Sequence, residues 1–260
     1  MPLPEVTVVM PVYNAEKTVI ASIESVLGQT FFSLELIVVD DCSSDATCDL
    51  IRRHQSIDKR LRLFRLDKNS GAAQARNKAI SEAQGRFIAF LDGDDLWQPE
   101  KLEEQLGFML GRDIAFSYTA YERIDEAGNV IGVMSAPEKL AYNDLLKTNY
   151  IGCLSVVYDT FKLGKFYMSV DSGREDYATW LKVLGQIEYA YGLNLVLAQY
   201  RVHSSQSSAK KTKMAMETWR LYRNVEHLDV ARAFYFFSHY AVRGFVRSIF
   251  PRLTRSFMSR

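Results

Sequence analysis

Four short apolar runs alternate with amphipathic segments over the first hundred residues, and this alternation restricts the possible folds more than any other feature of the chain. The runs are VTVVMPV, LELIVVDD, LRLFRLD and RFIAFLD, at residues 6–12, 34–41, 61–67 and 86–92. Runs of this length, rich in β-branched residues, are typical of buried strands. Because helical segments separate them, the sequence predicts an α/β fold with a mostly parallel sheet and helices on both faces.

The segments between these strands have the spacing and the caps of helices. They occupy residues 15–29, 43–55 and 71–84. In the first, apolar side chains recur at helical spacing, and Asn14 precedes them as a candidate N-cap.

The alternation ends at Pro99. Beyond it the sequence predicts a helix, a hairpin with an Ala-Gly-Asn turn, a helix, a strand, a helix and a strand, at residues 100–110, 113–134, 141–149, 153–159, 175–187 and 193–202. Residues 203–213 are rich in Ser and Lys and predict a mobile loop.

Charge is unevenly distributed along the chain, although the formal net charge is only +1. Residues 209–260 contain eleven Lys and Arg against three Asp and Glu. The balanced chain as a whole is not expected to bind nucleic acid, whereas its basic tail suits a negatively charged surface. With 48% hydrophobic and 24% charged residues, the composition is that of a folded globular protein.

The basic tail contains a predicted amphipathic helix that ends at Pro251. One face carries apolar residues and the opposite face arginines: Val230, Phe234, Phe237, Ala241 and Phe245 on the first, and Arg232, Arg243 and Arg247 on the second. Such a helix can lie in a membrane interface, or it can dock on the core with its arginines in solvent. The sequence leaves both interpretations open.

The cysteines and the N-terminus bear on the cellular compartment. Cys42, Cys48 and Cys153 match neither a zinc site nor a redox pair, so we expect reduced thiols. The first residues lack the cationic and apolar regions of a signal peptide, and no run of about 18 apolar residues could form a membrane span. We therefore expect a cytoplasmic protein that is peripheral on the inner face of the cytoplasmic membrane.

Three aspartates, Asp92, Asp94 and Asp95, follow directly on the fourth apolar run. Like charges repel, so this arrangement is unfavourable unless a cation or a substrate binds there. An EF-hand is excluded because Trp97 stands where its loop needs a glycine, and a helix N-cap would explain only one aspartate. We predict a site for Mn²⁺ or Mg²⁺ with few protein ligands, in which Gly93 lets the backbone turn sharply.

Two common phosphate-binding loops are absent from the sequence. No G-x-G-x-x-G motif follows the first strand, and no G-x-x-x-x-G-K-[ST] motif occurs. A nicotinamide-dependent dehydrogenase and a P-loop NTPase are therefore not expected, and phosphate would be bound by a metal and by side chains. Arg76 is a candidate diphosphate ligand, although an arginine on a helix equally suits a surface ion pair.

Four blocks of sequence resemble, in order and spacing, the family 2 inverting glycosyltransferases, which have a Rossmann-like GT-A fold. The blocks are VVMPVYNAEKTVIASIESVLGQT, LELIVVDDCSSDAT, NSGAAQARNKAISEAQGRFIAFLDGDDLWQPEKL and GREDYATWL. The resemblance covers about residues 5–205. It implies a nucleotide-sugar-binding half at 1–125, an acceptor-binding half at 126–205, and a mobile loop with amphipathic helices at 206–260.

The resemblance also implies roles for individual residues. Nucleotide binding falls to Pro11, Val12, Tyr13, Asp41 or Asp40, Asn69, Arg76, Asp92 and Gly93. Asp92 and Asp94 match the D-x-D motif that binds the metal, with Asp94 as the more direct ligand, and Asp95 would face the metal or the acceptor.

A Glu-Asp pair at 175–176 is the second chemical element that the resemblance singles out. Taken alone, it could simply complement a helix dipole. In the family the matching aspartate is the general base, so Asp176 would deprotonate the acceptor hydroxyl, with Glu175 beside it. Arg201 and His203 would reach the diphosphate or the metal, although a lone histidine is more often structural.

The resemblance is closest to the β-1,3-glucosyltransferases of bacterial O-antigen and capsule synthesis. It implies a UDP-sugar donor, first UDP-glucose and second UDP-galactose, and a saccharide acceptor on undecaprenyl diphosphate. The basic tail would then face the inner leaflet. A non-catalytic nucleotide-sugar-binding scaffold is the alternative, but it predicts loss of aspartates that this chain retains.

Overall fold

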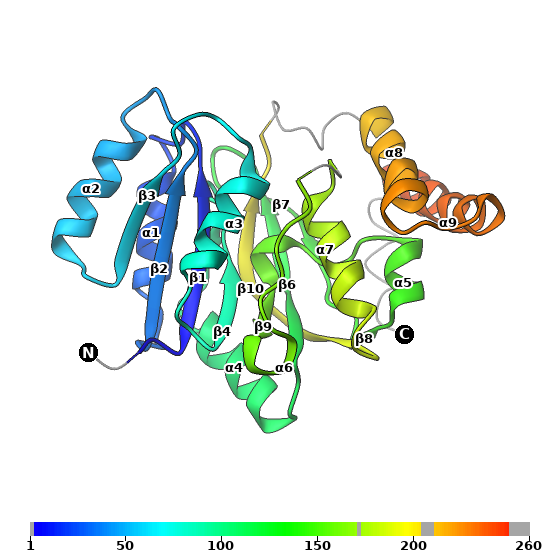
Figure 1. The fold of residues 1–260 in the computed structure, drawn as a ribbon, viewed down its shortest axis with the longest axis horizontal. Coiled ribbons are helices and arrows are strands. Elements are labelled where there is room, and N and C mark those ends of the chain that lie inside the picture. Colours follow the sequence, from blue (N-terminus) through cyan, green and yellow to red (C-terminus); the bar gives the residue numbers. More distant parts are fainter. Residues whose placement is uncertain (1–2, 171–172, 204–210, 250–260) are drawn as a thin grey trace.

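The four apolar runs near the N-terminus form the parallel strands that the sequence predicts. In the computed structural model, which describes residues 3–170, 173–203 and 211–249, they are β1 (Val6–Val12), β2 (Leu34–Asp40), β3 (Leu61–Arg65) and β4 (Phe87–Phe90) (Figure 1). β1 lies between β2 and β4, and β3 pairs with β2, all in parallel.

The rest of the sheet is mixed. It consists of β5 (Leu96–Trp97), β6 (Phe116–Ile124), β7 (Val130–Met134), β8 (Lys139–Leu140), β9 (Val157–Asp159) and β10 (Ala190–Arg201). The main strand order in the described residues is β3-β2-β1-β4-β9-β6-β10-β5. β10 runs parallel to β6, whereas β9 runs antiparallel to both of its neighbours. The short strands β5 and β8 carry too little pattern to be predicted from sequence.

Helices cover both faces of the sheet, as predicted (Figure 1). They are α1 (Val19–Leu27), α2 (Thr47–Ile57), α3 (Ala72–Glu82), α4 (Lys101–Gly111), α5 (Tyr142–Lys147), α6 (Thr160–Leu163), α7 (Glu175–Leu184), α8 (Lys211–Arg220) and α9 (Val230–Ile249). Side chains alternate along a strand, so Val8 belongs to the core cluster that includes residues of α1 and α4, while Val9 belongs to the cluster that includes residues of α3 and α7. The two faces therefore have separate cores.

Several predicted boundaries were wrong, among them the start of the first helix and the start of the strand at 153–159. Asn14 does not cap a helix, because it adopts a left-handed backbone with φ of 48° and its side-chain oxygen accepts the Ser44 N–H. α1 begins only at Val19, which leaves residues 13–18 as a loop. The strand predicted at 153–159 begins with a 3-10 turn, η1 (Cys153–Ser155). Residues 204–210 of the predicted mobile loop lie outside the described residues.

The predicted C-terminal helix is present as α9 and contacts α5 and α8. Its docked side contains Ala233, Phe236 and Phe237, and the Arg243 guanidinium donates a hydrogen bond to the Tyr150 hydroxyl at 2.6 Å. Phe237 and Arg243 thus both lie on the docked side, although the sequence pattern had placed them on opposite faces of the helix. Pro251 and the side chains of Phe245 and Arg247 lie outside the described residues.

A second apolar face of α9 is exposed. Val230, Phe234 and Val242 are each more than 60% exposed, and Ala241 is exposed beside them. Docking on the core is therefore correct for one face of α9, whereas membrane contact by the exposed face stays a prediction. No helix among the described residues is long and apolar enough to cross a bilayer.

Candidate functional site

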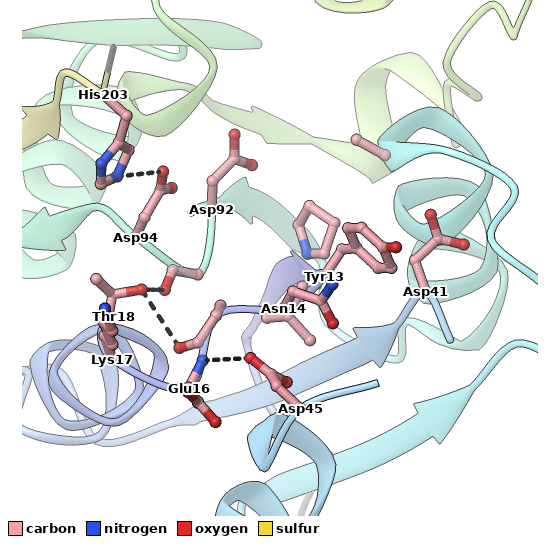
Figure 2. Close-up of a pocket in the computed structure, with 15 residues that line it drawn as sticks. Tyr13, Asn14, Glu16, Lys17, Thr18, Asp41, Asp45, Asp92, Asp94 and His203 are labelled. Carbon is pink, nitrogen blue, oxygen red and sulfur yellow. Dashed lines mark hydrogen bonds and ion pairs between the residues drawn. The ribbon is translucent and has the colours of Figure 1, made fainter. Parts of the chain in front are cut away.

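A cleft of about 530 Å³ opens beyond the C-terminal end of β1 (Figure 2). In open α/β sheets this edge is the usual place for ligands. Its lining comes from β1 and the following loop, the end of β2, the starts of α2 and α3, the loop after β4 and the end of β10: Pro11, Val12, Tyr13, Asn14, Ala15, Glu16, Lys17, Thr18, Asp41, Asp45, Ala72, Asp92, Gly93, Asp94 and His203.

Asp41, rather than Asp40, faces this cleft. The Asp41 carboxylate accepts the backbone N–H of Ser70 at 2.7 Å and that of Gly71 at 2.8 Å, so it fixes the entry to α3. Asp40 is fully buried and pairs with Arg65 at 3.2 Å on the other side of the chain. The two adjacent carboxylates point apart because successive side chains of a strand face opposite sides.

Pro11, Val12 and Tyr13 form a continuous part of the cleft wall. Tyr13 is 51% exposed, which leaves an aromatic face free to contact a planar base. Asn69 is exposed in the loop before α3 and is not among the lining residues.

Residues 14–18, in the loop after β1, also line the cleft and were not predicted as site residues from the sequence. The Glu16 N–H donates to Asp45 at 3.2 Å, and the Thr18 hydroxyl donates to the Gly93 carbonyl at 2.8 Å (Figure 2). These bonds tie the loop to α2 on one side and to the aspartate segment on the other. The sequence did not predict this loop, because its polar residues are also typical of the first turn of a helix.

Asp92 and Asp94 lie side by side but have different partners, and Figure 2 shows the contact of Asp94 with His203. The Asp92 carboxylate accepts two hydrogen bonds from the Arg76 guanidinium, at 2.6 and 2.8 Å. Asp94 lies 3.2 Å from Nε2 of His203, at the end of β10. Burial, together with the charge of Asp92, raises the pKa of Asp94 above its ordinary value.

Asp95 is turned into the protein. It is 1% exposed, and its carboxylate accepts the backbone N–H of Arg201 at 2.8 Å. Burial, then the charges of Asp94 and Asp92, hold its pKa well above the ordinary range. Only two of the three aspartates therefore reach the cleft, and the third joins it to β10.

Gly93 is needed for close packing rather than for a turn. A Cβ at this position would lie 2.6 Å from Cγ1 of Val12, and its φ is not among the left-handed ones. The turn expected from the sequence is present, since the Asp95 N–H donates to the Asp92 carbonyl at 3.1 Å, but its backbone angles do not by themselves require a glycine.

Asp94 and His203 are the residues best placed to hold a divalent cation. Among the described residues no group of three or more Asp, Glu, His or Cys side chains is assembled for this purpose. A carboxylate and an imidazole suit Mn²⁺ or Mg²⁺ only if the diphosphate and water supply the remaining ligands. Asp92 is already engaged by Arg76.

The Glu-Asp pair opens α7, close to the aspartate segment. Arg76 joins the two regions because its guanidinium also donates to Glu175 at 3.2 Å. The Asp176 carboxylate accepts a hydrogen bond from the backbone N–H of Tyr177 at 2.7 Å. Burial, followed by the charge of Glu175, raises the pKa of Asp176, while Arg174 and Arg76 oppose the shift. A partly buried carboxylate of raised pKa can accept a proton near neutral pH.

Residues 7–167 match the sequence model of glycosyl transferase family 2. The chain is 44% identical over 239 residues to TuaG of Bacillus subtilis, a protein whose name assigns it to teichuronic acid biosynthesis. The matched region covers 92% of this chain and 95% of TuaG. It is 40% identical over 238 residues to the Escherichia coli UDP-Glc:alpha-D-GlcNAc-diphosphoundecaprenol beta-1,3-glucosyltransferase WfgD, covering 91% and 92% of the two chains.

Solved structures show the same fold at low sequence identity. TarS of S. aureus in complex with UDP superposes with a TM-score of 0.69 at 22% identity, over 95% of this chain and 74% of TarS. A mannosyltransferase of Pyrobaculum calidifontis, in complex with GDP-Man and Mn²⁺, gives 0.67 at 18%, over 94% and 75%. With the GT-A fold, the matched family model and these relatives, the chain belongs to glycosyl transferase family 2 and is a glycosyltransferase.

Proposed function

We propose that the protein transfers a hexose, with inversion, from a UDP-sugar to a hydroxyl of a saccharide on undecaprenyl diphosphate. UDP-glucose and a β-1,3 linkage are our first choice, since they are the donor and linkage in the name of WfgD. O-antigen or another surface polysaccharide is the expected product. The observation that carries the proposal is the Arg76 contact, which joins the cleft at Asp92 to the helix of Asp176.

In this proposal the donor lies along the cleft. The uracil stacks near Tyr13 and bonds to Asp41, whose carboxylate keeps acceptor capacity beyond its two backbone bonds. Asp94 and His203 hold Mn²⁺ or Mg²⁺, as the Mn²⁺ in the mannosyltransferase structure also suggests. The bound metal would neutralise the diphosphate as it leaves. Arg201 supports this end of the cleft through a 3.0 Å bond to the Asp94 carbonyl.

Asp176 is the proposed general base. It takes the proton of the acceptor hydroxyl while that oxygen attacks the anomeric carbon from the face opposite the diphosphate. The new glycosidic bond forms as the bond to the diphosphate breaks, so one displacement inverts the configuration. Residues 1–125 would thus bind the donor and residues 126–205 the acceptor.

The first experiment measures transfer and donor binding with UDP-glucose, UDP-galactose, GDP-mannose and dTDP-glucose, each with Mn²⁺ or with a chelator. The acceptor is a GlcNAc-diphosphate-lipid, as in the name of WfgD. Metal-dependent transfer from UDP-glucose supports the full proposal, and transfer from UDP-galactose corrects only the sugar. Donor binding without any turnover would favour the non-catalytic scaffold.

We also propose that the exposed face of α9 rests on the inner membrane leaflet, where a lipid-linked acceptor resides. Val230, Phe234 and Val242 supply apolar surface without an intervening charge, and the tail around them is basic. Interfacial helices combine these two features.

Vesicle binding tests this surface. Phe234→Glu should weaken binding to vesicles of phosphatidylcholine with phosphatidylglycerol, because a carboxylate would enter the interface. The matched control is Phe32→Glu, since Phe32 is 76% exposed in the loop before β2. Equal binding by both variants and the wild type would show that this face of α9 does not contact the membrane.

A further inference from the structure

Arg76 is an unusual arginine because it is almost fully buried. It lies on α3, is 5% exposed, and does not line the cleft. One terminal nitrogen donates to both oxygens of Asp92, and the other donates to Glu175. Its Nε has no hydrogen-bond partner among the described residues.

The two carboxylates that meet at Arg76 come from opposite halves of the chain. Asp92 follows β4 in the donor-side half, and Glu175 begins α7, next to Asp176. Without Arg76, these two carboxylates would each lose their ion-pair partner while lying close together in a partly buried region. Like charges so placed repel, and α7 would move away from the end of β4.

An arginine that bound the diphosphate would have a different environment. It would present unpaired donors to the cleft, whereas both terminal nitrogens of Arg76 already bind carboxylates. An arginine suits such a junction because its planar, permanently charged fork can hold two carboxylates at fixed angles.

We propose that Arg76 is a positioning residue, which holds the N-terminus of α7 and hence Asp176 against the end of β4. This inference rests on the proposed function only in taking Asp176 as the base. Arg76 acts through Asp92 and Glu175 and does not touch the donor. We expect its loss to affect mainly the chemical step, with a smaller effect on donor binding through Asp92, which lines the cleft.

Steady-state kinetics of Arg76→Gln and Arg76→Lys test this role. We expect Arg76→Gln to reduce kcat about 100-fold, because small misplacements of a reacting group have effects of this size, while donor KM changes by less than about threefold. Arg76→Lys should recover part of kcat, since it keeps the charge but can bind one carboxylate at a time. A large rise in donor KM with unchanged kcat would identify a diphosphate ligand and overturn the inference.

A second arm does not depend on activity. Thermal unfolding is measured for Arg76→Gln, Glu175→Gln and the double variant. The single Arg76→Gln change should lower Tm, and adding Glu175→Gln should restore part of the loss, because one unpaired carboxylate is removed. Strictly additive changes in Tm would contradict the proposal that Arg76 links Asp92 and Glu175. This result does not depend on which donor the protein uses.

The matched control is another arginine–carboxylate pair outside the cleft. Arg86 donates to the buried Asp159 at 2.6 Å, on the strand pair β4 and β9. Arg86→Gln should lower Tm but leave kcat unchanged. If Arg86→Gln reduced kcat as much as Arg76→Gln, the effect of Arg76 would be general destabilisation, and the inference would fall.

Discussion

Replacing Lys101 by methionine would isolate the effect of one buried amine on stability. Lys101 lies in the first turn of α4 and is fully buried. Its Nζ donates to Gln105 at 2.7 Å and lies 4.1 Å from the centre of the Trp97 ring. Burial lowers the pKa of Lys101 from 10.5 to about 7. Methionine has a similar shape and cannot titrate.

The sign follows from proton binding. Between the folded pKa of about 7 and the unfolded pKa of 10.5, the unfolded chain binds more protons at Lys101 than the folded chain does. Stability therefore rises with pH in this window, and the penalty from the amine is greatest below it. The wild type should gain about 2 kcal/mol relative to Lys101→Met between pH 7 and pH 9, but only a few tenths between pH 6 and pH 7.

Urea unfolding of both proteins at these three pH values measures the difference directly. Other titrating groups cancel in the comparison, and the lost bond to Gln105 adds a constant offset, because amides do not titrate. A difference that stays constant from pH 7 to pH 9 would refute the reasoning. It would mean that Trp97 and Gln105 keep the amine charged in the folded protein.

Three further changes have definite expected outcomes. Asp176→Asn should reduce transfer by about 10²-fold or more with donor binding retained, and wild-type kcat/KM should decline on acidification through a pKa above 3.8. Gly93→Ala should destabilise by about 1–3 kcal/mol in urea unfolding, because its Cβ would meet Val12, whereas Gly107→Ala, in open space on α4, should stabilise by about 1 kcal/mol. His203→Ala should raise the Mn²⁺ concentration needed for half-maximal rate while leaving Tm nearly unchanged, and an unaltered Mn²⁺ dependence would remove His203 from the metal site.

The first half of the fold was predictable because its signals are local. A buried parallel strand such as β1 is an unbroken apolar run, and the helices between the strands repeat their apolar residues at helical spacing. The left-handed backbone of Asn14 was not predictable, since its partner Ser44 is 30 residues away.

The candidate site was predictable in its residue types but not in its pairings. The aspartates at 92–95 were identifiable from their like charges, yet their partners are distant in sequence. Arg76 and Glu175 are separated by 99 residues, and Asp95 and Arg201 by 106. Local patterns contain no record of such contacts.

The face on which α9 docks was unpredictable for a different reason. Phe234 and Phe237 are both apolar, and helical periodicity places each within an apolar face, but only Phe237 packs on the core. The sequence placed both side chains on one apolar face and could not show which part of that face docks.

The position of β10 has a consequence for how the protein is made. This strand pairs with β6 and β5, and its last residue, Arg201, gives Asp95 its hydrogen-bond partner. During synthesis the strands β1 to β4 can pair early, since domains fold from the N-terminus as the chain emerges. Asp92 can pair early with Arg76, whereas Asp94 and Asp95 find their partners His203 and Arg201 only after β10 is made. We expect a chain arrested before residue 190 to bind donor poorly, so that unfinished copies on the ribosome neither hold nor hydrolyse nucleotide sugar; donor binding by a truncated chain at wild-type strength would contradict this.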